Sequence, residues 1–228
     1  MRTDALDHIE PAVLTIQGML GNIDRLRLPA ATRREVVSIL VRQVSKELDD
    51  ALPWQTGHST RTATIAGLIG HVLGLSDSEL HDLELAALLH DIGLLMLSPE
   101  LRRGGAVLDA ASYVAIQNHS RLGANLLEPF AFLRDASLLI AHHHECWDGS
   151  GYPYGLRGEF IPLGARILAV ADAFEAIQVP KAPDRGLRNH IALRVLRVSS
   201  GTQFDPNLVG TLTLLEESLS SRDVPTLI

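Results

Sequence analysis

Apolar residues recur at helical spacing through most of this 228-residue chain, and no series of segments alternates apolar and polar residues as half-buried strands do. We therefore expect an all-α fold. The clearest helix spans 31–52, with Ile39 as the one apolar residue on its polar face. Its apolar face carries Val36, Val37, Leu40, Val41, Val44 and Leu48. Further helices are expected at about 58–74, 107–118, 120–127, 131–142, 163–178, 187–199 and 206–219. The last of these opens with Asp205 as N-cap and Pro206 at its first position.

One further helix is predicted by signals at both of its ends. Ser76 is followed three residues later by Glu79, a capping box that indicates the start of a helix. A run of leucines follows, and we expect Gly93 to end the helix. His90 and Asp91 would then lie in its last turn.

Composition narrows the class of protein. The chain is 46% hydrophobic and has 20 basic and 27 acidic side chains, a net charge of -7, with no basic block. Nucleic acid is therefore not an expected partner, because phosphate binding needs clustered Lys and Arg. No run of about 18 apolar residues is present, so no membrane span is expected. The single cysteine, Cys146, cannot form an internal disulfide, and acidic residues occupy the first 20 positions where a signal peptide would be basic and apolar. We expect a cytoplasmic location.

The chain divides into three parts by content. Residues 1–50 carry no chemical motif and are interpreted as an N-terminal helical segment for dimerisation or linkage, residues 51–218 as the functional domain, and 219–228 as a tail. Several apolar positions of the first segment still need cover once one face packs on the bundle, which predicts a helix-mediated homodimer. These positions are Leu14, Ile16, Met19, Leu20 and Ile23. The turn-rich stretch 147–164 is long for a compact helical domain, which favours a functional loop.

Histidines and aspartates at the ends of the expected helices form the candidate site. Imidazole and carboxylate together suit Fe, Mn or Zn. The candidates are His58, His90, Asp91, His119, His143, His144 and Asp172.

Each of these signals also has a structural interpretation. A His-Asp pair is weak by itself, since His81-Asp82 forms a second one that reads as an exposed polar couple. The run 142–144 can be a solvated stretch of histidines. Asp172 can simply hydrogen-bond to a neighbouring helix, although a bare carboxylate in its apolar surroundings would be costly.

Five motifs in order make the pattern more specific. They are His90-Asp91-Ile92-Gly93, His143-His144-Glu145, Asp148-Gly149-Ser150-Gly151-Tyr152-Pro153, Ala169-Val170-Ala171-Asp172 and Gly201-Thr202-Gln203-Phe204-Asp205-Pro206. Over roughly 50–218 the chain resembles the HD-GYP proteins, a branch of the HD-domain metal-dependent phosphohydrolases. The resemblance implies a helical bundle of the HD-domain type with an N-terminal helical extension, and hydrolysis of cyclic di-GMP or a related cyclic dinucleotide at a centre of two or three metals.

The resemblance also implies roles for individual residues. One metal would be held by His58, His90, Asp91 and Asp172. A second would be held by Asp91, His119, His143 and His144. Asp91 would bridge the two, His142 is left out as a solvent-exposed neighbour, and Tyr152 would contact the substrate. Two such metals can share a hydroxide of lowered pKa that attacks the phosphodiester.

The number and the kind of metal follow from the same resemblance. Some family members hold a third metal through a Glu, and Trp54 stands at that position here. We therefore expect two divalent metal ions per chain, iron or manganese first, with zinc, nickel or cobalt as alternatives.

The chain departs from the family where substrate cations are expected. Leu94 stands where the family usually carries a Lys, and Asp184 stands where it carries an Arg, whereas Lys181 and Arg185 are retained as candidate substrate-binding residues. Each lost charge-assisted contact would cost roughly 1.5–3 kcal/mol. Two interpretations follow. The chain is a phosphodiesterase of reduced activity, or a metal-loaded signalling module that binds partners such as a diguanylate cyclase domain.

Overall fold

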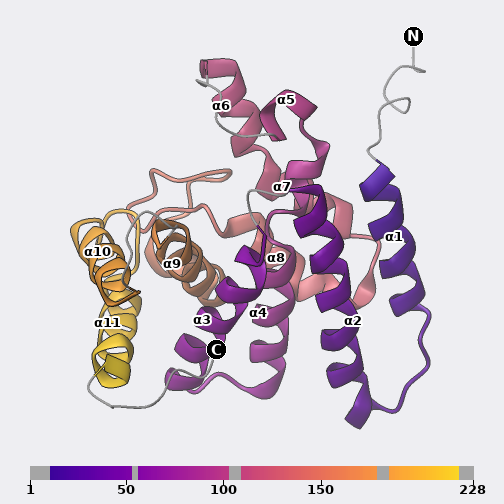
Figure 1. Ribbon diagram of the computed structural model, residues 1–228, viewed down its shortest axis with the longest axis horizontal. Coiled ribbons are helices and arrows are strands. Elements are labelled where there is room, and N and C mark those ends of the chain that lie inside the picture. The colour runs from indigo at the N-terminus through magenta and orange to yellow at the C-terminus, as the bar shows by residue number, and fades with distance from the viewer. Residues whose placement is uncertain (1–10, 53–55, 103–108, 179–184, 221–228) are drawn as a thin grey trace.

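The protein is described by a computed structural model that covers residues 11–52, 56–102, 109–178 and 185–220. These residues fold into helices joined by turns and one long loop, and they contain no strand (Figure 1). The predicted all-α fold is therefore confirmed.

The helices follow one another with short connections. The α-helices are α1 (Pro11–Asp24), α2 (Ala30–Ala51), α3 (His58–Val72), α4 (Asp77–Leu89), α5 (Pro99–Arg102), α6 (Ala110–Gln117), α7 (His119–Leu127), α8 (Arg134–His142), α9 (Leu163–Ile177), α10 (Arg185–Val198) and α11 (Pro206–Ser220). Three short 3-10 helices are η2 (Ile92–Met96), η3 (Ala131–Leu133) and η4 (Gly158–Phe160). The expected helices all occur, and their ends agree to within a few residues.

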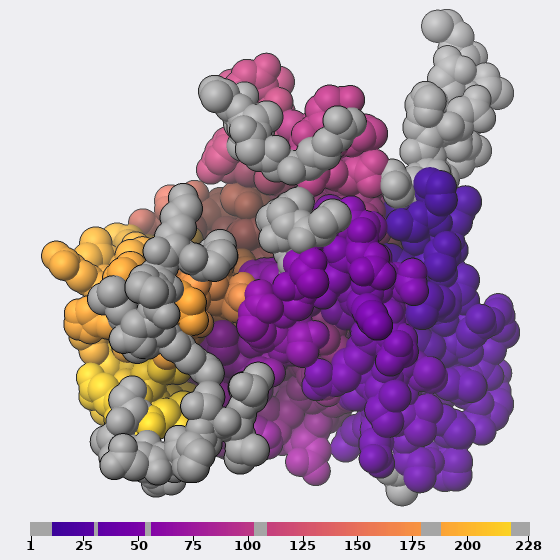
Figure 2. Space-filling view, in the orientation of Figure 1, coloured from indigo at the N-terminus to yellow at the C-terminus, as the bar shows by residue number. Residues whose placement is uncertain are grey.

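The core lies where α3, α4, α8 and α9 meet. The second half of α4 is buried on every side, because α2, α3, α8 and α9 all pack against it. In Figure 2, α1 and α2 (indigo to violet) cover one side of the molecule, and α10 and α11 (orange to yellow) cover the opposite side. Buried side chains from α1 to α11 belong to one continuous hydrophobic cluster. The division of the chain at residue 50 stays a prediction, since the two parts share this core.

The apolar positions of α1 are covered mainly within the chain. Ile16 and Leu20 are fully buried and Ile23 is 4% exposed, because α1 packs against α2. Met19 is half-buried against the same core, and only Leu14 is largely exposed, at 57%. The reason for expecting a homodimer is therefore wrong for all but one of these positions.

The predicted helix starts are confirmed, whereas the predicted role of one glycine is wrong. Ser76 and Glu79 form the capping box at α4, with the Ser76 N–H donating to Glu79 Oε2 at 2.8 Å. At α11, Asp205 Oδ1 accepts a hydrogen bond from the Asn207 N–H at 2.9 Å. The helix α4 ends before Gly93, which lies inside η2. A Cβ at Gly93 would stand 1.9 Å from the carbonyl oxygen of His119, so this glycine lets η2 approach α7.

None of the helices in the described ranges combines the length and the apolar character needed to cross a bilayer.

Candidate metal centre

The seven predicted ligands converge at one end of the bundle. His58 and His119 are the first residues of α3 and α7, and His143-His144 directly follows α8. The remaining three come from α4 and α9: His90 caps α4, Asp91 follows it, and Asp172 lies within α9. Helix ends supply most of these side chains because the bundle's connections meet there.

Three of the ligands form a first group between α3, α4 and α9. Its members are His58, His90 and Asp172, whose ligand atoms all lie within 4.8 Å of one another. Asp172 Oδ1 stands 3.0 Å from His58 Nε2 and 3.7 Å from His90 Nε2. The interpretation of Asp172 as a residue bonded to a neighbouring helix is thus compatible with its role as a ligand, since its partner is itself a candidate.

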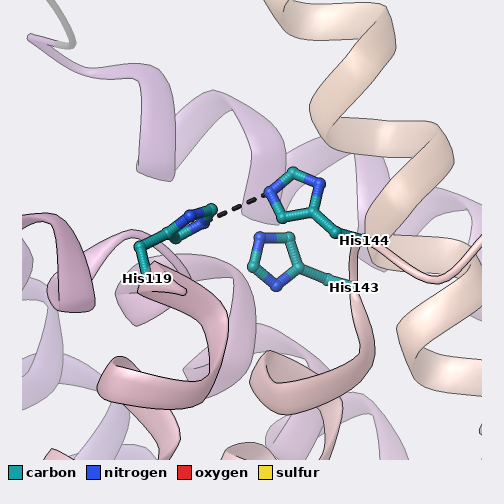
Figure 3. Close-up of side chains that lie close together, drawn as sticks. All are labelled: His119, His143 and His144. Carbon is teal, nitrogen blue, oxygen red and sulfur yellow. Dashed lines mark hydrogen bonds between the residues drawn. The ribbon is translucent and has the colours of Figure 1, made fainter. Parts of the chain in front are cut away.

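A second group forms between α7 and the end of α8. Its members are His119, His143 and His144, whose ligand atoms also lie within 4.8 Å of one another. Figure 3 shows the three imidazole rings turned toward a common point, with the Nε2 atoms of His119 and His144 3.2 Å apart. The group contains no carboxylate of its own.

Asp91 lies between the two groups and contacts both. Its Oδ2 stands 3.2 Å from His90 Nε2, and its Oδ1 stands 3.3 Å from His119 Nε2. Burial alone would raise the pKa of Asp91, but the neighbouring His90 and His119 hold it well below its usual range. An ionised carboxylate that presents one oxygen to each group has the geometry of a bridging ligand.

The donor set fits divalent metal ions. His90, His119 and His143 each donate their Nδ1–H to a backbone carbonyl one turn earlier, at 2.9, 2.6 and 2.7 Å. Such bonds hold the Nε2 nitrogen unprotonated and oriented for coordination. The Nε2 of His143 is buried and has no hydrogen-bond partner. A buried nitrogen without a partner is costly, and a metal ion would satisfy it.

The two groups differ in their electrostatics. Burial would lower the pKa of His58, but its bonds to Asp172 and Glu175 outweigh burial and raise the pKa to about 10. Burial lowers the pKa of His144 to about 4, and the nearby His119 adds to the effect. The pKa of His143 falls well below its usual range for the same reasons.

Glu175 is a site residue that sequence reasoning missed. Its carboxylate bonds to Nδ1 of His58 and also accepts from Arg61 Nε at 2.5 Å. It therefore orients a candidate ligand from the side opposite the metals. The available signal was its position on α9, three residues after Asp172 and on the same helix face.

The loop that follows His144 is built against the second group. Tyr152 stacks on the His144 ring, with centroids 4.9 Å apart, and its N–H donates to the His144 carbonyl at 3.1 Å. A Cβ on Gly151 would stand 2.2 Å from the Cys146 nitrogen, so the glycine permits this close approach. Glu145, for which we predicted no role, is buried and accepts from the N–H groups of Tyr154 and Leu156 at 2.7 and 3.0 Å.

A cavity of about 290 Å³ opens beside the ligands. Its floor is formed by His143, His144 and Asp172, and its walls by Tyr113 and Gln117 of α6, the loop around Tyr152, and Gln203-Phe204 before α11. Burial and then the nearby Tyr113 raise the pKa of the Tyr152 phenol. The size suits a small ligand, and the position places that ligand against the candidate metals.

The predicted substrate cations lie outside this picture. Within the part of the chain that the structure describes, no Lys or Arg lines the cavity. Trp54, Lys181 and Asp184 fall outside the described residues, and so does the side chain of Arg185, which begins α10. Leu94 is 7% exposed and packs in the hydrophobic core, so it does not line the cavity.

Two other histidines lie outside the groups. The His142 side chain is only 12% exposed and its ring lies against Tyr154, so its description as a solvent-exposed neighbour is wrong. His81 is half-buried against Ser38 of α2, and its partner Asp82 is half-buried as well. The second His-Asp pair therefore belongs to the contact between α2 and α4.

Comparison with known proteins gives a family and several relatives. The family model described as HD domain matches residues 42–208. The chain is 35% identical over 177 residues to the cyclic di-GMP phosphodiesterase response regulator RpfG of Xanthomonas campestris, covering 75% of this chain and 47% of that protein. It is 32% identical over 173 residues to 3'3'-cGAMP-specific phosphodiesterase 3 of Vibrio cholerae, covering 76% and 38%. The chain thus spans less than half the length of these relatives.

Solved structures share the architecture. The crystal structure of the V. cholerae cyclic GMP-AMP specific phosphodiesterase V-cGAP3 matches with a TM-score of 0.63 and 26% identity, covering 79% of this chain and 48% of that one. The HD domain of L. monocytogenes phosphodiesterase PgpH, in complex with cyclic-di-AMP, matches with a TM-score of 0.54 at 15% identity, covering 80% and 99%, which is a likeness of fold. These findings support the resemblance to HD-GYP proteins, and the extent of the family match shows that the chain belongs to the HD domain family.

Proposed function

We propose that this chain is a metal-dependent phosphodiesterase that opens a cyclic dinucleotide by hydrolysing a phosphodiester bond. The observation that carries the proposal is the position of Asp91, whose two oxygens contact a histidine of each ligand group. The names of the relatives supply the substrate class, since they act on cyclic di-GMP and 3'3'-cGAMP.

The proposed centre holds two divalent metal ions per chain, with iron or manganese favoured over zinc, nickel or cobalt. One ion would be held by the first group and the other by the second, with Asp91 shared between them. Bound there, the ions would supply Lewis-acid activation of water and of the phosphodiester oxygens. The buried, partnerless Nε2 of His143 supports the second site, and the 3.0 Å contact of His58 with Asp172 supports the first.

The chain's own residues would hold this chemistry in place. Glu175 orients His58, and the backbone carbonyl partners of His90 and His119 keep their Nε2 atoms unprotonated. Tyr152, packed on His144, is proposed as a substrate contact at the edge of the cavity. Lys181 and Arg185 are proposed as the cations that meet the substrate phosphates.

A second candidate is a metal-loaded signalling module that acts through partners such as a diguanylate cyclase domain. The observation that favours it is the lack of Lys and Arg among the described residues that line the cavity, because a cyclic dinucleotide carries two negative phosphates. A homodimer and a cytoplasmic location belong to either proposal and rest on the sequence arguments alone.

The test is hydrolysis by purified, metal-analysed protein. Cyclic di-GMP and 3'3'-cGAMP are incubated with it under reducing conditions, and the products are separated by chromatography. We expect a linear dinucleotide or mononucleotides from the wild type and none from His90→Ala. If fully metal-loaded wild type hydrolyses neither compound, the phosphodiesterase proposal is wrong and the signalling module takes its place.

A further inference from the structure

The cavity beside the ligands is walled by neutral hydrogen-bonding groups and aromatic rings. Tyr113 and Gln117 lie four residues apart on α6, so they share one helix face, and both line the cavity. The Tyr113 side chain is 55% exposed, which leaves its ring accessible to a ligand. On another wall, Tyr152 supplies a second ring.

Gln117 has no role in holding the fold together. Its side chain takes part in none of the side-chain hydrogen bonds of the described residues. The next residue, Asn118, is by contrast engaged with the α6 backbone through its donation to the Val114 carbonyl at 2.9 Å. A half-buried carboxamide that lines a cavity and has no internal partner is available to a ligand.

The chemistry of these groups suits a base better than a phosphate. A carboxamide offers one donor and one acceptor side by side, which complements the edge of a nucleobase. An aromatic ring stacks on a base face, and single nucleotides are recognised by this combination of stacking and edge contacts. Phosphate recognition would instead call for Arg or Lys, which no described wall of the cavity provides.

We propose that α6 carries a base-reading subsite, in which Tyr113 stacks on one purine of a cyclic dinucleotide and Gln117 hydrogen-bonds to the edge of that purine. This inference rests on the proposed function for the kind of ligand, but it concerns recognition and does not require hydrolysis. Gln117 is therefore a specificity-determining residue, and Tyr113 supplies the platform against which the base is read.

The decisive variant is Gln117→Glu, which replaces a donor-acceptor pair by acceptors alone. The Watson-Crick edge of guanine presents two donors to such a group, whereas adenine presents an acceptor. Affinity for cyclic di-GMP relative to cyclic di-AMP should therefore rise by about tenfold or more. Repulsion of the phosphates by the new charge acts on both compounds equally and cancels in the ratio.

The measurement is calorimetric binding of the phosphorothioate analogues of both compounds to the full, metal-loaded chain, because these analogues resist hydrolysis. Gln43→Glu is the matched control, since it makes the same change at an exposed position of α2 and should leave the ratio unaltered. Tyr113→Ala should weaken binding of both analogues roughly 5- to 150-fold, and Tyr113→Phe should retain it.

The outcomes separate this inference from the proposed function. If wild type binds the analogues but hydrolyses neither parent compound, the enzyme proposal fails, and a shifted ratio in Gln117→Glu still supports the subsite. If Gln117→Glu leaves the ratio within twofold of wild type, or if Tyr113→Ala binds as tightly as Tyr113→Phe, the subsite is wrong even where hydrolysis is rapid. Failure of wild type to bind either analogue overturns the subsite as well.

Discussion

The two ligand groups hold similar atoms in different electrostatic settings. In the first, Asp172 and Glu175 surround His58 and raise its pKa to about 10, so the group is balanced by a proton. In the second, three imidazoles face one another, and burial lowers the pKa of His143 and His144. The second group thus presents neutral nitrogen donors at ordinary pH, whereas the first must release a proton before it binds a metal.

The groups also differ in what supports them. The first is braced by α3 and α9, through the contacts of His58 with Asp172 and Glu175. The second is in contact with the substrate loop, because Tyr152 stacks on His144. A change in the loop should therefore reach the second group first, and a change in α9 should reach the first.

Asp91→Ala should have the largest effect, because it removes the one carboxylate that both groups share. We expect the metal content to fall from near two ions per chain toward zero, and hydrolysis to fall at least about 1,000-fold, which corresponds to about 4 kcal/mol. Elemental analysis and the hydrolysis assay measure the two effects.

The matched control for Asp91→Ala is Asp82→Ala, which changes the aspartate of the other His-Asp pair on the same helix. This variant should retain its metals. Retention of two metals by Asp91→Ala itself would remove the bridging role.

His119→Ala should separate the two groups. Its ring belongs to the second group only, so we expect the loss of about one metal per chain and a loss of activity of more than about 100-fold. Elemental analysis should find the remaining metal on the first group, in a variant that still unfolds cooperatively. Loss of both metals would mean that the groups are occupied only together.

Much of this arrangement was predictable from the sequence, because helix periodicity and capping signals are local. The capping box at Ser76 and the N-cap at Asp205 depend only on neighbouring residues, and both helices start as expected. The seven ligands were named through their motifs and the family they resemble, and the structure places them together. Their metal-binding roles stay a prediction.

What the sequence could not show depends on contacts between distant segments. Gly93 resembles a helix stop in the sequence, yet its requirement comes from the His119 carbonyl, which belongs to another helix. Glu175 and Gln117 carry no motif, and their surroundings exist only once α9 and α6 are placed. The cover of Ile16 likewise comes from tertiary packing, which an isolated amphipathic pattern does not reveal.

Glu175→Gln should weaken the first group and spare the second. The amide keeps the shape of the side chain, but it removes the negative charge that holds the His58 ring by its Nδ1 atom. Substitutions of this kind cost about 10- to 100-fold in metal affinity. Competition with a chelator, followed by elemental analysis, should show one metal released at lower chelator concentration than in wild type. Equal release of both metals would contradict the assignment.

The smallest expected effect is a difference in how the metal-free protein responds to pH. The depressed pKa of His144 means that between about pH 6.5 and 4 the unfolded chain binds a proton that the folded chain does not. Its contribution to stability is therefore lost as the pH falls through this window. His58 acts in the opposite direction, because between about pH 6.5 and 10 the folded chain holds a proton that the unfolded chain has released. Its contribution is lost as the pH rises.

Urea unfolding in the presence of a chelator, from pH 4 to 10, measures both contributions as differences between variants. Burial raises the pKa of Asp82 to about 6 and opposes His144 in the acid window, so only the difference from wild type isolates each histidine. His144→Gln should lose less stability than wild type on acidification, and His58→Gln should lose less on alkalinisation. If the two variants follow the wild-type curve in parallel at all pH values, the two groups do not differ in the proton balance that separates them here.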